Sequence, residues 1–278
     1  ALEILDSRGR PAVKAWCTLR DGVTAEVSVP SGASTGAAEA LELRDGDAKR
    51  YRGLGCLQAV AHINNTLNTA LSGQSFVGQS ELDNRLRQLD GTPDKSHLGA
   101  NSLLAVSLAF AHAQALEARV PLYQQFATLL GESPRHLPRL TINLFSGGKH
   151  AGGQTAIQDV LIVPMAASIN QSLAVAYDVY QTAAELIETK YDARPLKADE
   201  GGLAPPFPDT EMMFRDAVEA ILSAGYQPGK EVSLAVDDTF LAPGSTTFFS
   251  GLRIQRRLCV CCQSSIDAQP MRAGSSRP

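Results

Sequence analysis

The stretch Val13-Lys-Ala-Trp-Cys-Thr-Leu-Arg-Asp-Gly-Val-Thr-Ala-Glu-Val-Ser-Val29 decides the fold of the amino-terminal part of the chain. On either side of Asp21-Gly22, apolar residues recur at every second position, which is the period of a strand buried on one face. Asp-Gly between two such runs predicts a β-hairpin with a tight type I′ turn, because glycine accepts a positive φ angle. Cys17 falls on the apolar face, where we expect a buried, unreactive thiol.

Three helices are predicted after this hairpin, over residues 55–71, 79–89 and 101–118. The third is rich in alanine, which suits close helix packing, and its apolar stripe is predicted to contain Leu104, Leu108 and Ala115. Two strands followed by helices indicate a compact α+β domain, which we assign to residues 1–130. A connection containing Gly, Pro and Ser follows and marks the boundary.

Strands alternate with helices in a second predicted domain, residues 131–240. Short apolar strands are expected over 140–145, 157–163 and 232–236, and helices over 171–190 and 211–224. The stripe expected to be buried on the first of these helices contains Leu173, Tyr177, Tyr180, Ala184 and Ile187. Asp209 or Thr210 can cap the second helix, and Gly225 can end it in a left-handed conformation. The alternation favours an α/β fold, the opening of a barrel or a sheet.

The composition is that of an ordinary globular protein. The 278 residues are 44% hydrophobic and 19% charged, with a net charge of −4, which predicts neither a nucleic-acid partner nor an anionic membrane surface. No apolar run approaches the roughly 18 residues of a membrane span, and the first residues lack the pattern of a secretory signal. Five cysteines do not make a disulfide framework in a chain of this length. We therefore expect a cytoplasmic protein.

Residues 241–278 differ in character from the rest. Residues 1–240 contain 28 acidic and 20 basic residues. Residues 241–278 contain five arginines and one acidic residue. It has no helical or strand period, and we interpret it as a divergent, disordered tail, from a frameshift, intron read-through or an alternative 3′ end. Its Cys259-Val-Cys-Cys262 run lacks the C-x₂-C spacing of structural zinc sites, which disfavours a metal site.

Two loops combine small residues with groups that can bind an anion or a metal. In Pro30-Ser-Gly-Ala-Ser-Thr-Gly36, small residues let backbone N–H groups and hydroxyls approach a ligand, although a plain flexible turn has the same composition. In Gly147-Gly-Lys-His-Ala-Gly-Gly153, glycines surround His150. That histidine is either a simple exposed loop residue or a proton donor or phosphate partner on a moving lid.

Two further segments carry carboxylates. In Lys197-Ala-Asp-Glu-Gly-Gly-Leu-Ala-Pro205, adjacent acids precede two glycines, so Asp199 and Glu200 point in different directions from a loop. One of them can face a site while the other orients it, and Glu200 is the candidate general acid. Asp237 ends a buried strand, where a carboxylate of a β/α barrel faces the site. It can bind Mg²⁺, although one carboxylate is rarely sufficient.

In their order and spacing, these loops resemble those of the enolases, the 2-phosphoglycerate dehydratases of glycolysis, over residues 3–238. The matching stretches are Glu3-Ile-Leu-Asp-Ser-Arg-Gly9, Val29-Pro-Ser-Gly-Ala-Ser-Thr-Gly36, Glu39-Ala-Leu-Glu-Leu-Arg-Asp-Gly-Asp47, Leu89-Asp-Gly-Thr92, Gly99-Ala-Asn101 and Asp199-Glu-Gly-Gly202. The resemblance implies an enolase-like amino-terminal α+β domain followed by the first part of a (β/α)8-type barrel, which is incomplete.

The resemblance also implies Mg²⁺-dependent conversion of 2-phosphoglycerate to phosphoenolpyruvate. A base removes the C2 proton, Mg²⁺ stabilises the enolate, and a carboxylic acid helps the C3 hydroxyl leave. By motif, Glu200 matches that acid, Ser34 the ligand of the second Mg²⁺, and Asp237 the first of three carboxylates that hold the tighter ion.

Three further residues match the substrate side of the enolase site: His150, Gln158 and Asp159. Asp159 stands where enolases usually have Glu, which questions the hydrogen bonding of this shorter side chain. Arg10 replaces the usual Asn after Asp-Ser-Arg-Gly.

The resemblance places several groups of the enolase site after residue 240: the catalytic Lys base, a second Lys, two metal carboxylates, and the phosphate-binding His and Ser. Without a positioned base and charge stabilisation, the C2 proton is too weakly acidic to be removed, so we expect this chain to be inactive alone. Three strands of eight would also leave the barrel open.

Two functions therefore compete. The first is an enolase-family lyase in incomplete form. The alternative is a non-catalytic truncated isoform or fragment that acts through its amino-terminal domain, by binding, in a homodimer or in a mixed dimer with a complete enolase subunit. Another activity of the wider superfamily, such as racemisation, is disfavoured by the loops 30–36 and 199–202.

Overall fold

The computed structural model describes residues 1–32, 38–134, 137–152, 155 and 157–237. The chain divides into unit 1, Ala1–Leu137, and unit 2, Pro138–Pro278, and each is described by itself. Ser34 and the tail predicted for residues 241–278 lie outside the described residues.

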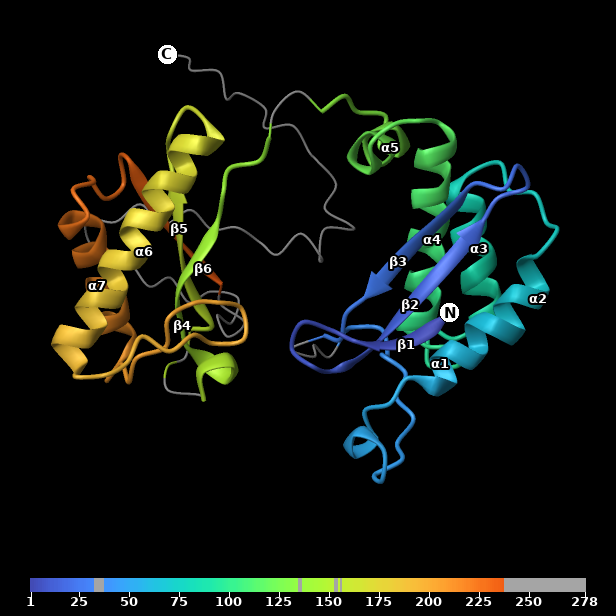
Figure 1. Cartoon of the computed structure of the whole chain (residues 1–278), viewed down its shortest axis with the longest axis horizontal. Coiled ribbons are helices and arrows are strands. Elements are labelled where there is room, and N and C mark those ends of the chain that lie inside the picture. Colours follow the sequence, from blue (N-terminus) through green and yellow to red (C-terminus); the bar gives the residue numbers. More distant parts are fainter. Residues whose placement is uncertain (33–37, 135–136, 153–154, 156, 238–278) are drawn as a thin grey trace, which may run out of the picture. The chain divides into compact units, whose positions relative to one another are not determined.

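Unit 1 contains an antiparallel sheet of β1 (Leu2–Leu5), β2 (Pro11–Thr18) and β3 (Thr24–Val29), in the order β1-β2-β3 (Figure 1). The β2–β3 hairpin confirms the prediction, but the type I′ turn was wrong. Gly22 N donates to Leu19 O at 3.0 Å and Leu19 N to Val23 O at 2.8 Å, so the connection has three residues. A type I′ turn needs positive φ at both central residues, and only Gly22 has it, at +90°.

Helices cover this sheet much as predicted. A helical segment from residue 57 to 71 is made of α1 (Leu57–Ala61), a π-helical segment (His62–Leu67) and α2 (Asn68–Leu71). It is followed by α3 (Gln79–Asp90) and α4 (Ala100–Glu117), and α4 packs against β2 and β3 (Figure 1). The strand β1, the helix α5 (Leu122–Leu129) and a short 3₁₀ helix (Tyr51–Gly53) were not predicted.

Two details of unit 1 differ from expectation. Leu104 is 47% exposed, so the stripe predicted on α4 was wrong at this residue, whereas Ala115 is buried and Leu108 packs against the core. Buried residues instead occupy most of the helix circumference, as Leu103, Ala105 and Ala109 illustrate. Cys17 is half-buried rather than buried, and this partial burial still raises the pKa of its thiol.

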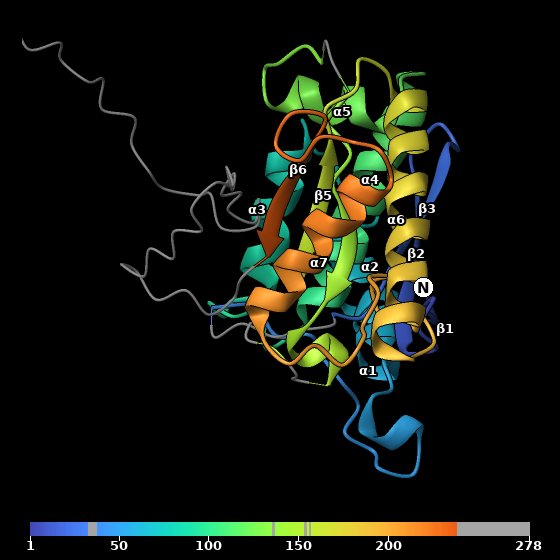
Figure 2. The same cartoon turned by 90° about the vertical axis from the view of Figure 1, so that its left-hand side faces the viewer.

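Unit 2 is built on β4 (Ile142–Ser146), β5 (Asp159–Pro164) and β6 (Val232–Asp237), in the order β4-β5-β6. Both pairs are antiparallel, so β4 and β6 run in the same direction. The helices α6 (Ile169–Tyr191) and α7 (Thr210–Ser223) cover one face of this sheet (Figures 1 and 2). The described part of unit 2 is thus the opening of a barrel that is not closed, as predicted.

The core of unit 2 lies between the helices and one face of the sheet. Ile162 pairs with Ile142 on one side and Leu234 on the other, and all three pack into this core. On α6 the predicted stripe was wrong at Leu173 and Tyr177, which are 54% and 66% exposed. It was right at Ile187, which is buried, and Tyr180 and Ala184 pack against the core. The buried residues of α6 are Ser172, Ala176, Val179, Ala183 and Ile187.

The ends of α7 confirm the predicted signals. Asp209 is the N-cap, and its Oδ1 accepts a hydrogen bond from Met212 N at 2.7 Å. Gly225 follows the helix with φ +87°, a conformation that glycine adopts without steric cost.

No single helix among the described residues has the length and apolar character needed to cross a membrane. The helices α4 and α5 pass that test only as a pair, and the pair is bent by 104°.

Candidate functional site

Three polar side chains form a row across one end of the unit 2 sheet. Ser146 ends β4, Asp159 begins β5 and Asp237 ends β6, and the register pairs Ser146 with Asp159 and Asp159 with Asp237. Side chains alternate between the two faces of a strand. On β5, Asp159 is an odd number of residues from Ile162, and on β6, Asp237 is an odd number of residues from Leu234. Because Ile162 and Leu234 pack into the core under the helices, the row lies on the opposite face of the sheet.

Asp159 is the more enclosed of the two carboxylates in this row. The residue is only 2% exposed, and its Oδ1 accepts a hydrogen bond from Ser146 Oγ at 2.5 Å. A buried carboxylate needs such donors, because burial without them costs several kcal/mol. The shorter side chain at this position therefore does have a hydrogen-bond partner, on the neighbouring strand.

Glu200 lies at the tip of a tight hairpin formed by residues 197–203. Lys197 pairs with Leu203, Ala198 N donates to Gly202 O at 2.8 Å, and Gly201 N donates to Ala198 O at 3.0 Å. We call this segment the acid hairpin. Gly201 has φ +88°, which allows the tight return after the exposed Glu200.

The acid hairpin is attached to β4 along its second arm. Leu203 N donates to Leu144 O at 2.8 Å, and Ser146 N donates to Leu203 O at 2.9 Å. Gly202 fits closely here, since an added Cβ would lie 2.3 Å from Ser146 Oγ. The glycine that follows Gly201 is therefore required for close approach to β4 rather than for loop flexibility.

Asn143 directs Glu200 toward the face that carries Ser146, Asp159 and Asp237, which we call the carboxylate row. Its Nδ2 donates to Glu200 Oε2 at 3.3 Å. Asn143 pairs with Leu161, which shares a face of β5 with Asp159. Glu200, Asp159 and Asp237 consequently lie on the same face of one sheet, as a shared site requires.

The loop between β4 and β5 is fixed at both ends by Gln158. Its carbonyl accepts a hydrogen bond from Gly147 N at 2.6 Å, and its N–H donates to Asp237 O at 3.2 Å. This loop contains a short 3₁₀ helix, Gly148–Ala151, which includes His150. The roles of the His150 and Gln158 side chains stay predictions, as does that of Ser34.

Sequence reasoning missed Asn143 and Ser146, although each contacts a predicted carboxylate. Asn143 is a polar residue inside a predicted apolar strand, and Ser146 stands immediately before the glycine-rich loop. A polar side chain at either place was a usable signal, because buried polar groups need partners.

Unit 1 holds the first residues of the other predicted loop. An Arg8 guanidinium N–H donates to Ser31 O, and Arg44 Nη2 donates to Ser31 Oγ at 2.6 Å. Arg10, the departure noted in the sequence, donates from Nη1 to Gly32 O at 3.4 Å. Three arginines thus anchor the residues that precede Ser34.

The oxygen atoms of the carboxylate row meet only part of what a Mg²⁺ site requires. Carboxylate oxygens are ligands that Mg²⁺ prefers, and Asp237 is exposed at its strand end. Across the described residues, no group of three or more His, Cys, Asp or Glu side chains could hold a metal ion. Asp237 therefore fits as one ligand of a site that needs further oxygen donors.

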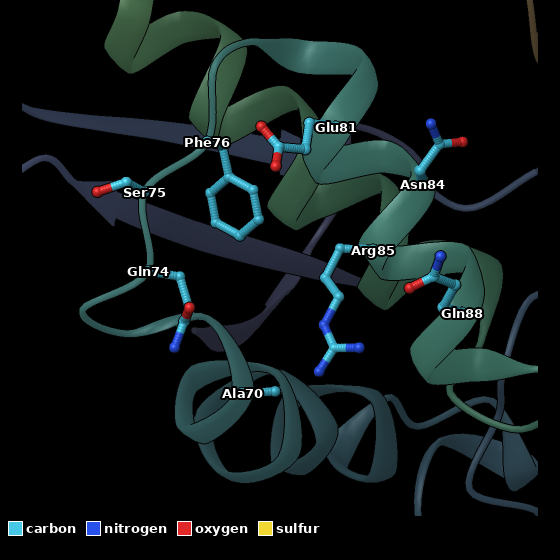
Figure 3. Close-up of a pocket in the computed structure, with 8 residues that line it drawn as sticks. All are labelled: Ala70, Gln74, Ser75, Phe76, Glu81, Asn84, Arg85 and Gln88. Atoms are coloured by element: carbon cyan, nitrogen blue, oxygen red, sulfur yellow. The ribbon is translucent and has the colours of Figure 1, made fainter.

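A surface cleft of about 400 Å³ lies in unit 1 between α2 and α3 (Figure 3). Its lining residues are Ala70, Gln74, Ser75, Phe76, Glu81, Asn84, Arg85 and Gln88. None of them belongs to the predicted loops, and we assign this cleft no part in the site.

Comparison with known proteins places both units in one family. A model described as "Enolase, N-terminal domain" matches residues 1–126, and one described as "Enolase, C-terminal TIM barrel domain" matches residues 134–249. The chain is 42% identical over 238 residues to the enolase of Desulfotalea psychrophila and 44% identical over 239 residues to that of Methanopyrus kandleri. Each match covers 85% of this chain but 55% of the relative, so the chain spans about half the length of these enolases. With both of its units matched to enolase domains, the chain belongs to the enolase family.

Proposed function

We propose that this chain carries the general-acid side of an enolase site, for the Mg²⁺-dependent conversion of 2-phosphoglycerate to phosphoenolpyruvate in the cytoplasm. The proposal rests on one observation above all. Glu200, Asp159 and Asp237 come from three separate segments that match enolases, and they lie on the same face of one sheet.

The reaction breaks the C2–H and C3–O bonds of the substrate, forms a C2=C3 double bond and releases water. In our proposal Glu200 gives its proton to the departing C3 hydroxyl, and the Asn143 amide sets the direction of its carboxyl group. Gln158, Asp159 and His150 contact the substrate.

Asp237 would hold the tighter Mg²⁺, and Ser34 the second ion. When bound, the metal neutralises the negative charge that develops on the substrate carboxylate. The Asp237 carboxylate is suited to this part because it lies at the end of β6, beside the buried Asp159.

We further propose that the 278 residues alone do not turn over substrate. Removal of the C2 proton requires a positioned base and charge stabilisation. In full-length enolases, we expect the lysine base and two of the metal-binding carboxylates to lie in the part of the protein that this chain does not span.

The test is an assay of phosphoenolpyruvate formation with Mg²⁺, on purified chain of confirmed intact mass. We expect no turnover, but we expect Mg²⁺ with 2-phosphoglycerate to shift the NMR signals of Asn143, Ser146 and Glu200. Glu200→Gln should weaken this binding, whereas Glu188→Gln, an exposed glutamate on α6, should leave it unchanged.

Two results would contradict these proposals. Turnover that Glu200→Gln abolishes would show that another residue or chain completes the site, against our expectation of inactivity. Signal shifts confined to residues outside the carboxylate row and the acid hairpin would refute the site itself.

A second function, binding through unit 1, is favoured by the separate core of that unit. This chain would then act in a homodimer or in a mixed dimer with a complete enolase subunit. Co-expression with a full-length enolase followed by affinity capture tests the mixed dimer, and recovery of the chain without the subunit would reject it.

A further inference from the structure

The acid hairpin is held from the helix side as well as from β4. Tyr180, on α6, packs against the core of unit 2, and its hydroxyl donates to Gly201 O at 2.7 Å. Gly201 directly follows Glu200. Burial raises the pKa of the Tyr180 phenol, so its hydroxyl keeps the proton that it donates.

The same tyrosine ring also contacts the first arm of the acid hairpin. Lys197 Nζ lies 5.6 Å from the centroid of the Tyr180 ring, within the range of a cation–π interaction. Lys197 pairs with Leu203 at the open end of the hairpin. One side chain therefore fixes both the base of the hairpin and the peptide unit next to its tip.

We propose that Tyr180 is a positioning residue for Glu200. It contacts the backbone that follows the carboxylate and not the carboxylate itself, so it acts by restricting the peptide between residues 201 and 202. Gly201 is otherwise free to change conformation, because a glycine has few steric limits on φ and ψ. The identity of Glu200 as the acid rests on the proposed function, whereas the restriction of the hairpin does not.

Tyr180→Phe is the sharpest test, since it keeps the ring over Lys197 and removes only the hydroxyl. We expect the amide protons of Ala198 and Gly201, which close the hairpin, to exchange with solvent about fivefold faster. That factor corresponds to one hydrogen bond of about 1 kcal/mol. We also expect a change in the carboxyl ¹³C shift of Glu200, a signal that a general loss of stability would not move selectively.

Two other tyrosine-to-phenylalanine variants in unit 2 serve as controls. Tyr226→Phe removes a comparable hydrogen bond, from Tyr226 Oη to Asp178 Oδ2 at 2.7 Å, which does not involve the hairpin. Tyr177→Phe alters a tyrosine of α6 that is 66% exposed. Both should leave exchange at Ala198 and Gly201 and the Glu200 carboxyl signal unchanged.

The outcomes separate this inference from the proposed function. Unchanged exchange and an unchanged Glu200 signal in Tyr180→Phe, or equal changes in Tyr226→Phe, would overturn the positioning role. Failure of 2-phosphoglycerate to bind would overturn the proposed function and leave the result for Tyr180 standing.

Discussion

Replacing Gly202 with alanine should disrupt the contact between the acid hairpin and β4. The added Cβ would lie 2.3 Å from Ser146 Oγ, 3.1 Å from Ser146 N and 3.3 Å from Phe145 C. Rotation of the serine side chain would relieve the shortest contact but would break its bond to the buried Asp159. The other two contacts are with backbone, which is fixed by the hydrogen bond from Ser146 N to Leu203 O.

The expected loss in the free energy of unfolding of unit 2 follows from these contacts. Overpacking a tight site costs about 1–3 kcal/mol, and a lost hydrogen bond costs about 1 kcal/mol more. We therefore expect a loss of about 3 kcal/mol. With an m-value of about 2 kcal/mol/M, the urea midpoint of unit 2 should fall by about 1.5 M.

The assay can follow the two units separately. Trp16 is the only tryptophan of the chain and lies on β2, so its fluorescence reports unfolding of unit 1. Hydrogen exchange of the β5 and β6 amides in urea reports unit 2. Gly202→Ala should lower the second midpoint and leave the first unchanged.

Two further variants separate crowding from backbone conformation. Gly201 has φ +88° with nothing within 4 Å of an added Cβ, so Gly201→Ala should cost only about 1 kcal/mol. Adding Ser146→Gly to Gly202→Ala removes the 2.3 Å contact but not the backbone contacts, and should restore part of the stability. Equal losses for the two single alanine variants would refute the crowding argument.

Three other predictions concern buried polar groups. A hydrogen bond from Arg50 is the main cause that lowers the pKa of Glu3. The ionised Glu3 therefore stabilises unit 1 above about pH 4.5, and this stabilisation is lost as the pH falls through the folded pKa. Glu3→Gln should flatten this acid dependence of unit 1 stability, measured by Trp16 fluorescence. Burial raises the pKa of Cys56 to about 11, so only about one thiol in a thousand is ionised at pH 8. Iodoacetamide should therefore leave Cys56 unalkylated until urea unfolds unit 1, which mass mapping would detect. The Asp216 side chain is 0% exposed and accepts hydrogen bonds from Lys190 Nζ and Tyr191 Oη; Asp216→Asn should cost unit 2 about 3 kcal/mol in urea unfolding.

Local signals in the sequence predicted the elements better than their buried faces. The Asp-Gly hairpin and the Asp209 cap are set by residues within a few positions of each other, so the sequence was sufficient to find them. The stripe predicted on α6 was wrong at Leu173 and Tyr177, because large apolar residues were taken as the buried ones, and it was confirmed at Ile187. Small residues such as Ala176 and Ala183 face the sheet instead, and Tyr177 is exposed.

The candidate site was predictable as a set of residues but not as an arrangement. Asp159 and Asp237 were each found by motif, yet they meet only because β5 runs antiparallel to β6. No periodicity within one strand encodes the direction of its neighbour. The contacts of Asn143 and Ser146 depend on the same pairing, which explains why these two residues were overlooked.

The proposed acid and the proposed metal ligand depend on different parts of unit 2. Glu200 is directed by Asn143 and, through Gly201, by Tyr180, so its position is set between β4 and α6. Asp237 lies at the end of β6, two strands from β4, and its link to the site is the backbone of Gln158 and the register with Asp159. Asp237→Ala should therefore weaken Mg²⁺ binding while leaving the exchange of the acid hairpin unchanged, and faster exchange at Gly201 in that variant would show that the acid and metal sides are coupled.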